Sequence, residues 1–157
     1  MTKIHITTFI AAPIERVFNL CRSINLHKIS AAGTKEDAIA GITSGLINLD
    51  ETVTWQARHL FKTRRHTSKI TAMQTPVNFT DEMVTGDFKS FCHEHYFKAV
   101  DNGTIMIDIL IFESPYGVVG KIFNKIYLKK YLQHFLQKRN AVIKNYAETE
   151  KWKTMLY

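Results

Sequence analysis

The chain has 157 residues, of which 45% are hydrophobic, and it carries a formal net charge of +7. This length suits a single domain spanning residues 1–157, and the composition excludes disordered and collagen-like proteins. No apolar run reaches the roughly 18 residues that a membrane span requires. The first residues lack the apolar core of a signal peptide, so we expect a cytoplasmic protein. Cys21 and Cys92 have no metal-ligand spacing and are expected to be reduced thiols.

The basic charge is concentrated at one end of the sequence. Up to Pro115 the chain has 12 basic and 12 acidic residues, whereas the remainder has 9 basic and 2 acidic residues. A basic segment attached to a neutral body can mark a nucleic-acid or anionic-membrane partner. The alternative is a helix whose solvent-facing side is rich in lysine, which is the more common origin of such a run.

The first third of the chain predicts a strand followed by two short helices. Lys3–Ile10 is rich in isoleucine and threonine, which favours a strand. Pro13 then suits the start of a helix, where its missing N–H costs nothing. Helical spacing forms one apolar face from Ile14, Val17, Phe18 and Cys21. A second short helix is predicted over Leu26–Ala32.

Six further strands are predicted after Gly33. They cover Glu36–Ile42, Glu51–Phe61, His66–Gln74, Phe79–Thr85, Phe91–Val100 and Thr104–Phe112. In the second of these, alternation places one set of side chains on the inward face: Val53, Trp55, Ala57, His59 and Phe61. Lys62–Arg65 is predicted to be a polar turn. The connections are too short for parallel crossovers, so the strands should form an antiparallel meander.

The C-terminal segment predicts a helix with a break. Plotted at helical periodicity, one apolar stripe comprises Val118, Val119, Ile122, Phe123 and Ile126. A second stripe, rotated by about a third of a turn, comprises Leu128, Leu132, Phe135, Leu136, Ile143 and Tyr146. A single straight helix cannot bury both stripes against one surface. We therefore expect a break or kink near Tyr127–Leu128, with a short helix before it and a long one after it.

The sequence resembles the START-like or SRPBCC superfamily, also called Bet v 1-like or helix-grip. The resemblance covers essentially the whole chain and depends most on residues 10–18 (IAAPIERVF), 43–47 (TSGLI), 51–59 (ETVTWQARH) and 112–115 (FESP). These stretches look like those of a bacterial subgroup labelled cyclase/dehydrase-like. The resemblance implies an α+β fold in which a curved antiparallel sheet of about seven strands wraps around a long C-terminal helix, with two short helices between the first two strands.

The same resemblance implies a cavity for a hydrophobic ligand between the sheet and the long helix. Members of the superfamily include lipid carriers, hormone receptors, aromatic polyketide cyclases and subunits of ring hydroxylases. A fold of this kind specifies no single activity. The residues that line the implied cavity must therefore carry the functional argument.

Arg139 lies in the middle of the apolar stripe of the predicted long helix. Its neighbours three, four and seven positions away are all apolar or aromatic: Leu132, Phe135, Leu136, Val142, Ile143 and Tyr146. Because an unpaired buried guanidinium is costly, Arg139 requires an acidic partner, backbone carbonyls or an anionic ligand. Two interpretations remain open. One is a structural ion pair or a side chain that reaches solvent; the other is a cavity cation that orients a carboxylate or phenolate of a ligand.

Three histidines are candidates for the inward face of the sheet. Strand alternation groups them with aromatic residues, as Phe91, His93, His95 and Phe97 on one strand and Trp55 and His59 on another. They are candidate zinc ligands, acid–base or hydrogen-bonding groups for a ligand, or ordinary core residues. No carboxylate or third histidine lies at a familiar metal-site spacing, so we expect no metal and no other cofactor.

Asp108 is a candidate second buried charge. Its strand alternates so that Asp108 shares a face with Met106, Leu110 and Phe112. An acidic residue on an apolar face needs a cationic or hydrogen-bonding partner. Our first choice for the partner of Arg139 is therefore Asp108, ahead of Glu82 and Glu94.

The leading functional interpretation is a module that binds a hydrophobic, aromatic or lipid-like small molecule. Its apolar walls would come from Trp55, Phe91, Phe97 and Phe135, and its orienting polar groups from His59, His93, His95, Asp108 and Arg139.

The alternative is an enzyme resembling polyketide cyclases or dehydrases. In that enzyme His93 or His95 would act as the base and Arg139 would stabilise an enolate. The sequence has no glycine-rich phosphate loop, Gly-x-Ser-x-Gly elbow or Cys-x-x-Cys pair.

A peripheral contact with anionic membranes is the second partner hypothesis. It uses part of the polar face of the predicted long helix, with Lys129, Lys130, Lys138 and Lys144. These lysines lack the interleaved aromatic residues on which single-stranded nucleic acids stack, so we expect no nucleic-acid partner.

Overall fold

The structure is a computed structural model that describes residues 1–59 and 61–156. One antiparallel sheet of seven strands has the order β1-β7-β6-β5-β4-β3-β2. The strands are β1 Thr2–Ile10, β2 Asp37–Gly41, β3 Thr52–His59, β4 Lys62–Gln74, β5 Asn78–Thr85, β6 Ser90–Val100 and β7 Gly103–Glu113. The helices are α1 Ile14–Cys21, α2 Ile24–Ser30, α3 Gly117–Phe123, α4 Lys129–Glu148 and α5 Lys153–Leu156. Short turns of other helical types are η1 Ala32–Thr34, η2 Asn124–Leu128 and η3 Glu150–Trp152, of which η2 is a π-helix.

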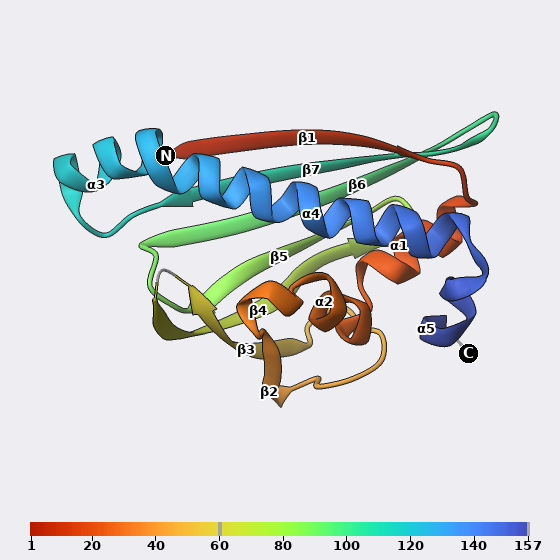
Figure 1. The fold of residues 1–157 in the computed structure, drawn as a ribbon, viewed down its shortest axis with the longest axis horizontal. Helices are drawn as coiled ribbons and strands as arrows, with labels where there is room; N and C mark the ends of the chain where they lie inside the picture. The colour runs from red at the N-terminus through yellow and green to blue at the C-terminus, as the bar shows by residue number, and fades with distance from the viewer. Residues whose placement is uncertain (60, 157) are drawn as a thin grey trace.

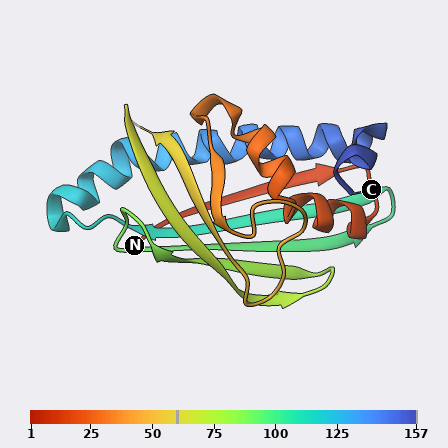
Figure 2. The same ribbon diagram turned by 90° about the horizontal axis from the view of Figure 1, so that it is seen from below.

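The connectivity brings the first strand beside the last one. β3 to β7 follow one another as antiparallel neighbours, and β1 pairs with β7 from Thr2 opposite Phe112 to Ile10 opposite Thr104. Figure 1 shows α4 lying along the sheet over β1, β7 and β6, and Figure 2 shows the strands curving beneath it. The predicted α+β helix-grip arrangement, with α1 and α2 between β1 and β2, is confirmed.

The two N-terminal helices close one end of the core. In α1, Val17 and Phe18 are fully buried, and the Phe18 ring packs edge-on against Phe79 and Phe97 at centroid distances of 5.6 and 5.3 Å. The second helix, α2, begins earlier than predicted because the Ser23 hydroxyl caps it by accepting a hydrogen bond from the Leu26 amide. The same packing brings Cys21, the last residue of α1, to the inside of the molecule.

The C-terminal helix is continuous from Gly117 to Glu148, so it has no break, but a π-helical turn, η2, interrupts its α-helical geometry at the position where the sequence predicts a break or kink. The second apolar stripe faces the sheet, with Leu128, Leu136 and Ile143 buried. The first stripe is not buried, contrary to expectation: Val118 and Val119 are each 74% exposed. The physical reason is that α3 extends beyond the end of the sheet, as Figure 1 shows, so no strand lies under it.

Two strand boundaries differ from the prediction. β3 ends at His59, and Phe61 adopts a positive φ of 64° and is 95% exposed, so it does not share the inward face of Trp55. β4 begins at Lys62, so the residues predicted to form a polar turn pair with β3 instead. Polar side chains by themselves do not exclude a strand, so these residues extend the hairpin of β3 and β4. Among the described residues, no helix is both long and apolar enough to cross a lipid bilayer.

Candidate functional site

A cavity of about 370 Å³ lies between the sheet and α4. The sheet contributes apolar walls such as Val53, Trp55 and Ile70, and α4 contributes Leu132, Phe135 and Leu136. Tyr116 and Phe123, from the segment that holds α3, line it at the end where α3 lies. Charged and imidazole groups are set into these walls, so the cavity is not uniformly apolar.

Seven of the nine predicted site residues line the cavity. They are Trp55, His59, Phe91, His93, His95, Phe135 and Arg139. Their contact with a ligand stays a prediction. The other two lie elsewhere: Phe97 is in the core against Phe18, because α1 covers this part of β6, and Asp108 lies behind the wall, where it contacts His93.

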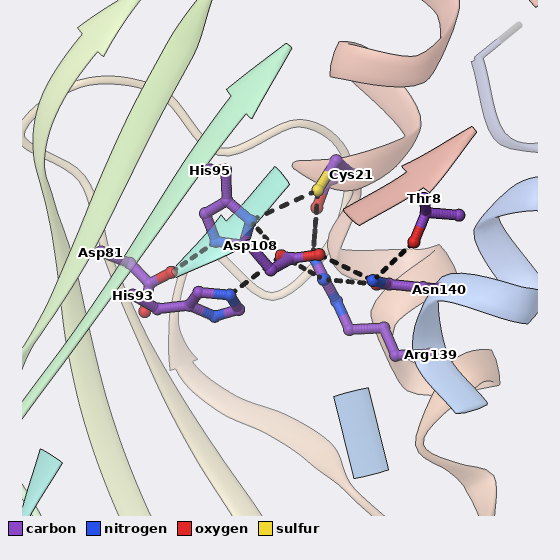
Figure 3. A network of polar contacts seen from close by, with 8 residues as sticks. All are labelled: Thr8, Cys21, Asp81, His93, His95, Asp108, Arg139 and Asn140. Carbon is purple, nitrogen blue, oxygen red and sulfur yellow. Dashed lines mark hydrogen bonds and ion pairs between the residues drawn. The ribbon is translucent and has the colours of Figure 1, made fainter. Parts of the chain in front are cut away.

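Asp108 is the centre of a buried polar network, which Figure 3 shows. Its side chain is fully buried, and its Oδ1 accepts a hydrogen bond from Nε2 of His93 at 2.9 Å. The same oxygen lies 3.1 Å from Nδ1 of His95. On the other side, Asn140 donates from Nδ2 to Oδ2 at 2.7 Å. The two histidine contacts hold the pKa of Asp108 well below its ordinary value, against burial, which alone would raise it.

Arg139 extends from α4 into this network, and its predicted pairing with Asp108 is found. The Nη1 group donates to Asp108 Oδ1 at 3.4 Å, and Nη2 donates to the Cys21 sulfur at 3.0 Å and to the Cys21 carbonyl at 3.4 Å. The guanidinium is therefore held by protein groups although Arg139 also borders the cavity. Burial acts to lower the pKa of Arg139, but Cys21 and Asp108 keep it above its ordinary value, so the group stays charged.

His95 lies between two carboxylates. Its Nδ1 faces Asp108, and its Nε2 lies 3.0 Å from Oδ2 of Asp81 on the neighbouring strand. Burial favours the neutral ring, but Cys21 and the two carboxylates raise the pKa of His95 well above its ordinary value. Phe79 stacks on the ring at a centroid distance of 4.2 Å and so fixes its plane.

His93 differs from its neighbour because only one ring nitrogen is bonded. Nε2 donates to Asp108, and within the described part of the chain the other nitrogen has no hydrogen-bond partner. Burial, and then the nearby His95, lower the pKa of His93, so the ring is neutral at physiological pH. A neutral imidazole oriented by a buried carboxylate is a candidate base at the cavity wall.

Glu36 forms a second carboxylate–imidazole cluster on the opposite wall. Its Oε1 accepts from Nε2 of His27 at 2.7 Å, and its Oε2 lies 3.8 Å from Nε2 of His59. The other ring nitrogen of His59 is hydrogen-bonded to the Tyr131 hydroxyl of α4 at 2.6 Å. Burial acts to raise the pKa of Glu36, but His27 and His59 hold it well below its ordinary value.

Sequence reasoning missed several cavity residues, including His27, Glu36, His66, Asp81 and Tyr131. Asp81 pairs with His93 across β5 and β6. Counting residue pairs outward from the predicted turn between these two strands would have placed Asp81 opposite His93. Opposite residues share a face of the sheet, so Asp81 could have been predicted as a neighbour of the histidines. Glu36 and His27 lie in an irregular segment and a short helix, for which no periodic signal exists. Within the described residues, Asp81, His93 and His95 form a group able to hold a metal ion.

Solved structures similar to this chain support the fold. The alignment with TTHA0849, a protein of Thermus thermophilus, covers 92% of this chain and 95% of that protein, with 17% identity and a TM-score of 0.75. Protein Ms6760 of Mycobacterium smegmatis covers 91% of this chain and 88% of its own, with 17% identity and a TM-score of 0.67. Ginseng major latex-like protein 151 of Panax ginseng covers 94% of this chain and 98% of its own, with 15% identity and a TM-score of 0.70.

No protein-family model matches the chain, and no curated protein matches it. At these identities the structural neighbours establish the fold and not the activity. Together with the seven-stranded sheet gripping α4, they show that the chain shares the fold of these solved structures.

Proposed function

We propose that this protein binds a small molecule with an apolar or aromatic body and at least one polar group. The observation that carries the proposal is the cavity of about 370 Å³, whose apolar walls contain two carboxylate–imidazole clusters. Pockets for small ligands commonly have volumes of about 300–1,000 Å³ and a few placed polar groups among apolar ones. The Bet v 1-like fold supports a ligand-binding role in general terms.

The polar groups available to such a ligand differ from those predicted. Arg139 is already paired with Asp108 and Cys21, which favours its structural role over orientation of an anionic ligand. His66 and Ser68 line the cavity, and within the described residues neither side chain has a hydrogen-bond partner. We infer that they, with the free nitrogen of His93, would meet the polar part of the ligand.

Native mass spectrometry of gently purified protein, followed by a thermal-shift screen of lipids and aromatic compounds, tests this proposal. We expect a co-purified or stabilising ligand whose effect is reduced by Phe135→Ala. The matched control is Gln137→Ala, because Gln137 is exposed on the same helix. Failure to find any ligand in either experiment would contradict the proposal.

A cyclase- or dehydrase-like enzyme is the second candidate, and the His93–Asp108 pair favours it. His93 would remove a proton next to a carbonyl group, and the positive charges of His95 and Arg139, although held by protein groups, would favour the enolate through space. Deuterium exchange into an aromatic β-diketone, followed by NMR, measures this step without a known substrate. We expect His93→Gln to abolish the exchange and His134→Gln, at an exposed position of α4, to retain it. Exchange at the uncatalysed rate with the wild-type protein would exclude this chemistry for that substrate class.

We also propose that an anionic membrane is the source or destination of the ligand. Seven large apolar side chains between Tyr116 and Tyr127 are 39–74% exposed, and two of them, Tyr116 and Phe123, also line the cavity. Lys121 and Lys130 are exposed next to them. Apolar residues flanked by lysines suit the interface of an anionic bilayer. This surface differs from the lysine face that the sequence predicts for membrane contact. One lysine of that predicted face, Lys144, is already bonded to Glu148 and to the Phe9 carbonyl.

Co-sedimentation with liposomes tests the membrane contact. We expect binding that requires anionic lipid, weakens with salt and is lost in Val118→Ser/Ile122→Ser. Val84→Ser is the matched control, because Val84 and Ile122 are both 57% exposed. Binding that ignores lipid charge, or that survives the double substitution, would contradict this contact.

A further inference from the structure

We propose that Asp81, His93 and His95 form a binding site for a divalent transition-metal ion that opens into the cavity. The inference does not depend on the organic ligand, because it concerns only side chains of β5 and β6. The sequence predicts no metal here because it supplies only the His-x-His pair of one strand. The third donor comes from the neighbouring strand, where Asp81 lies opposite His93.

The donor atoms lie close enough for one ion. One atom from each of the three side chains lies within 4.8 Å of the other two, and Asp81 Oδ2 is 3.0 Å from His95 Nε2. Two donors about 2.1 Å from a metal and about 90–110° apart are themselves separated by about 3.0–3.4 Å. The Asp81–His95 pair already has this separation. The His93 donor atom, which lies within 4.8 Å of the other two, needs to approach the pair by about 1.8 Å at most, judged against that spacing.

Asp108 supplies the support that metal-binding histidines usually have. A histidine ligand commonly donates its other N–H group to a carboxylate, which fixes the ring and its tautomer. Here one carboxylate serves both rings, with Oδ1 at 2.9 Å from His93 and 3.1 Å from His95. Asn140 holds the remaining oxygen of Asp108, so the carboxylate cannot turn away.

The contact between Asp81 and His95 needs either a proton or a metal ion. The Nε2 atom of His95 is hydrogen-bonded to Asp81 Oδ2 at 3.0 Å, while its Nδ1 atom lies 3.1 Å from Asp108 Oδ1 and 3.6 Å from the Cys21 sulfur. Without a proton or a metal ion between Nε2 and the carboxylate oxygen, two acceptors would face each other and repel. A proton satisfies this requirement, and so does a metal ion bound to both atoms. The two cations therefore compete for the same position.

The donor set indicates which ions the site would take. Two imidazoles and one carboxylate suit Zn²⁺, Fe²⁺ and related ions, whereas Mg²⁺ and Ca²⁺ prefer oxygen ligands. All three residues line the cavity, and the Asp81 side chain is 21% exposed, so an ion held by them would be accessible from the cavity. Three protein ligands with open positions are typical of metal sites that also bind water or substrate.

Titration of tag-free, chelator-treated full-length protein with Co²⁺ tests the site. We expect one ion per chain and visible d–d absorption that differs from that of the free ion. Competition with Zn²⁺, Fe²⁺, Mn²⁺ and Mg²⁺ then distinguishes the candidate ions, with Mg²⁺ expected to compete least. A spectrum identical to that of free Co²⁺ would mean that only a proton bridges Asp81 and His95, and would overturn the proposal.

Variants separate this site from adventitious binding at surface histidines. Asp81→Asn keeps a hydrogen-bonding group beside His95, and we expect it to weaken Co²⁺ binding about tenfold or more. His95→Gln should remove the absorption. His134→Gln changes an exposed histidine of α4 and should bind like the wild-type protein. A loss of absorption in His134→Gln, or full retention in Asp81→Asn while circular dichroism shows both folded, would contradict the assignment.

Discussion

The two carboxylate–imidazole clusters of the cavity have the same chemical core but different surroundings. Asp108 lies on β7, between β1 and β6, is fully buried, and contacts Arg139 and Asn140 in addition to its two histidines. Glu36 precedes the edge strand β2 and contacts His27, His59 and the Thr34 hydroxyl. The Asp108 cluster contains an arginine; in the described residues, the Glu36 cluster at the β2 edge, or edge cluster, does not.

This difference follows from burial. The Asp108 carboxylate is fully buried and cannot reach water, so protein groups must satisfy all of its hydrogen-bonding capacity. A carboxylate near the edge has partial access to solvent and needs fewer partners. We therefore expect removal of one partner to cost more at Asp108 than at Glu36, because a buried charge left without its partner is destabilising.

Arg139→Met should have the largest effect. It leaves Asp108 and its histidines without the guanidinium, and breaking a buried pair in this way costs about 3–5 kcal/mol. Urea unfolding followed by circular dichroism measures the change. Lys138→Met is the control, since Lys138 is exposed at the preceding position.

The double variant Arg139→Met/Asp108→Asn sharpens this result. If the two residues act as a pair, it should recover part of the loss, since coupled partners are not additive. If Arg139→Met alone is as stable as the wild-type protein but loses ligand binding, Arg139 orients the ligand and its structural role is wrong.

Glu36→Gln should have an intermediate effect at neutral pH. Hydrogen bonds to a charged group contribute about 1.5–3 kcal/mol, and glutamine retains part of the hydrogen bonding without the charge. The loss should therefore be smaller than that of Arg139→Met. Glu15→Gln, at an exposed position of α1, should leave the free energy of unfolding unchanged. A loss larger than that of Arg139→Met would reverse the comparison between the clusters.

The Glu36 contribution should disappear in acid. The pKa of Glu36 is lower in the folded state than in the unfolded state, where it is about 4.3. Its stabilisation is therefore present above the unfolded value and is lost as pH falls below it. The groups that face it are His27 of α2 and His59 of β3. The free energies of unfolding of the wild-type protein and Glu36→Gln should begin to converge below about pH 5 and keep converging as the pH falls toward the much lower folded-state pKa; a constant difference would show that charge is not the cause.

Tyr131→Phe should have the smallest effect. It removes the hydroxyl that bonds His59 at 2.6 Å and thereby links the edge cluster to α4. One hydrogen bond of this kind contributes about 0.5–1.5 kcal/mol. Tyr127→Phe is the control, because Tyr127 is 50% exposed on η2. Differential scanning calorimetry would detect the difference, and equal melting temperatures for the two variants would show that the link adds nothing.

The sequence by itself determined the architecture and the central ion pair. Strand alternation placed Asp108 on the same face as Met106 and Leu110, and helical periodicity placed Arg139 in the apolar stripe of α4. Both are local properties, since each depends only on how side chains repeat along one element. A buried charge of each sign in two elements that must pack together then predicts their contact. The irregularity before α4 was predicted at the right place but for an incomplete reason, because the first apolar stripe is exposed and not buried against a second surface.

Only the tertiary structure decided what surrounds that pair. Asp81 meets His95 because β5 and β6 pair in one particular register, and a shift of one residue would turn Asp81 to the other face. Glu36 meets His27 and His59 because the edge of the sheet curves toward α2, as Figure 2 shows. The apolar stripe of α3 is exposed because the sheet ends before it. Register, curvature and strand length arise from contacts between distant segments, and no periodicity within a single segment encodes them.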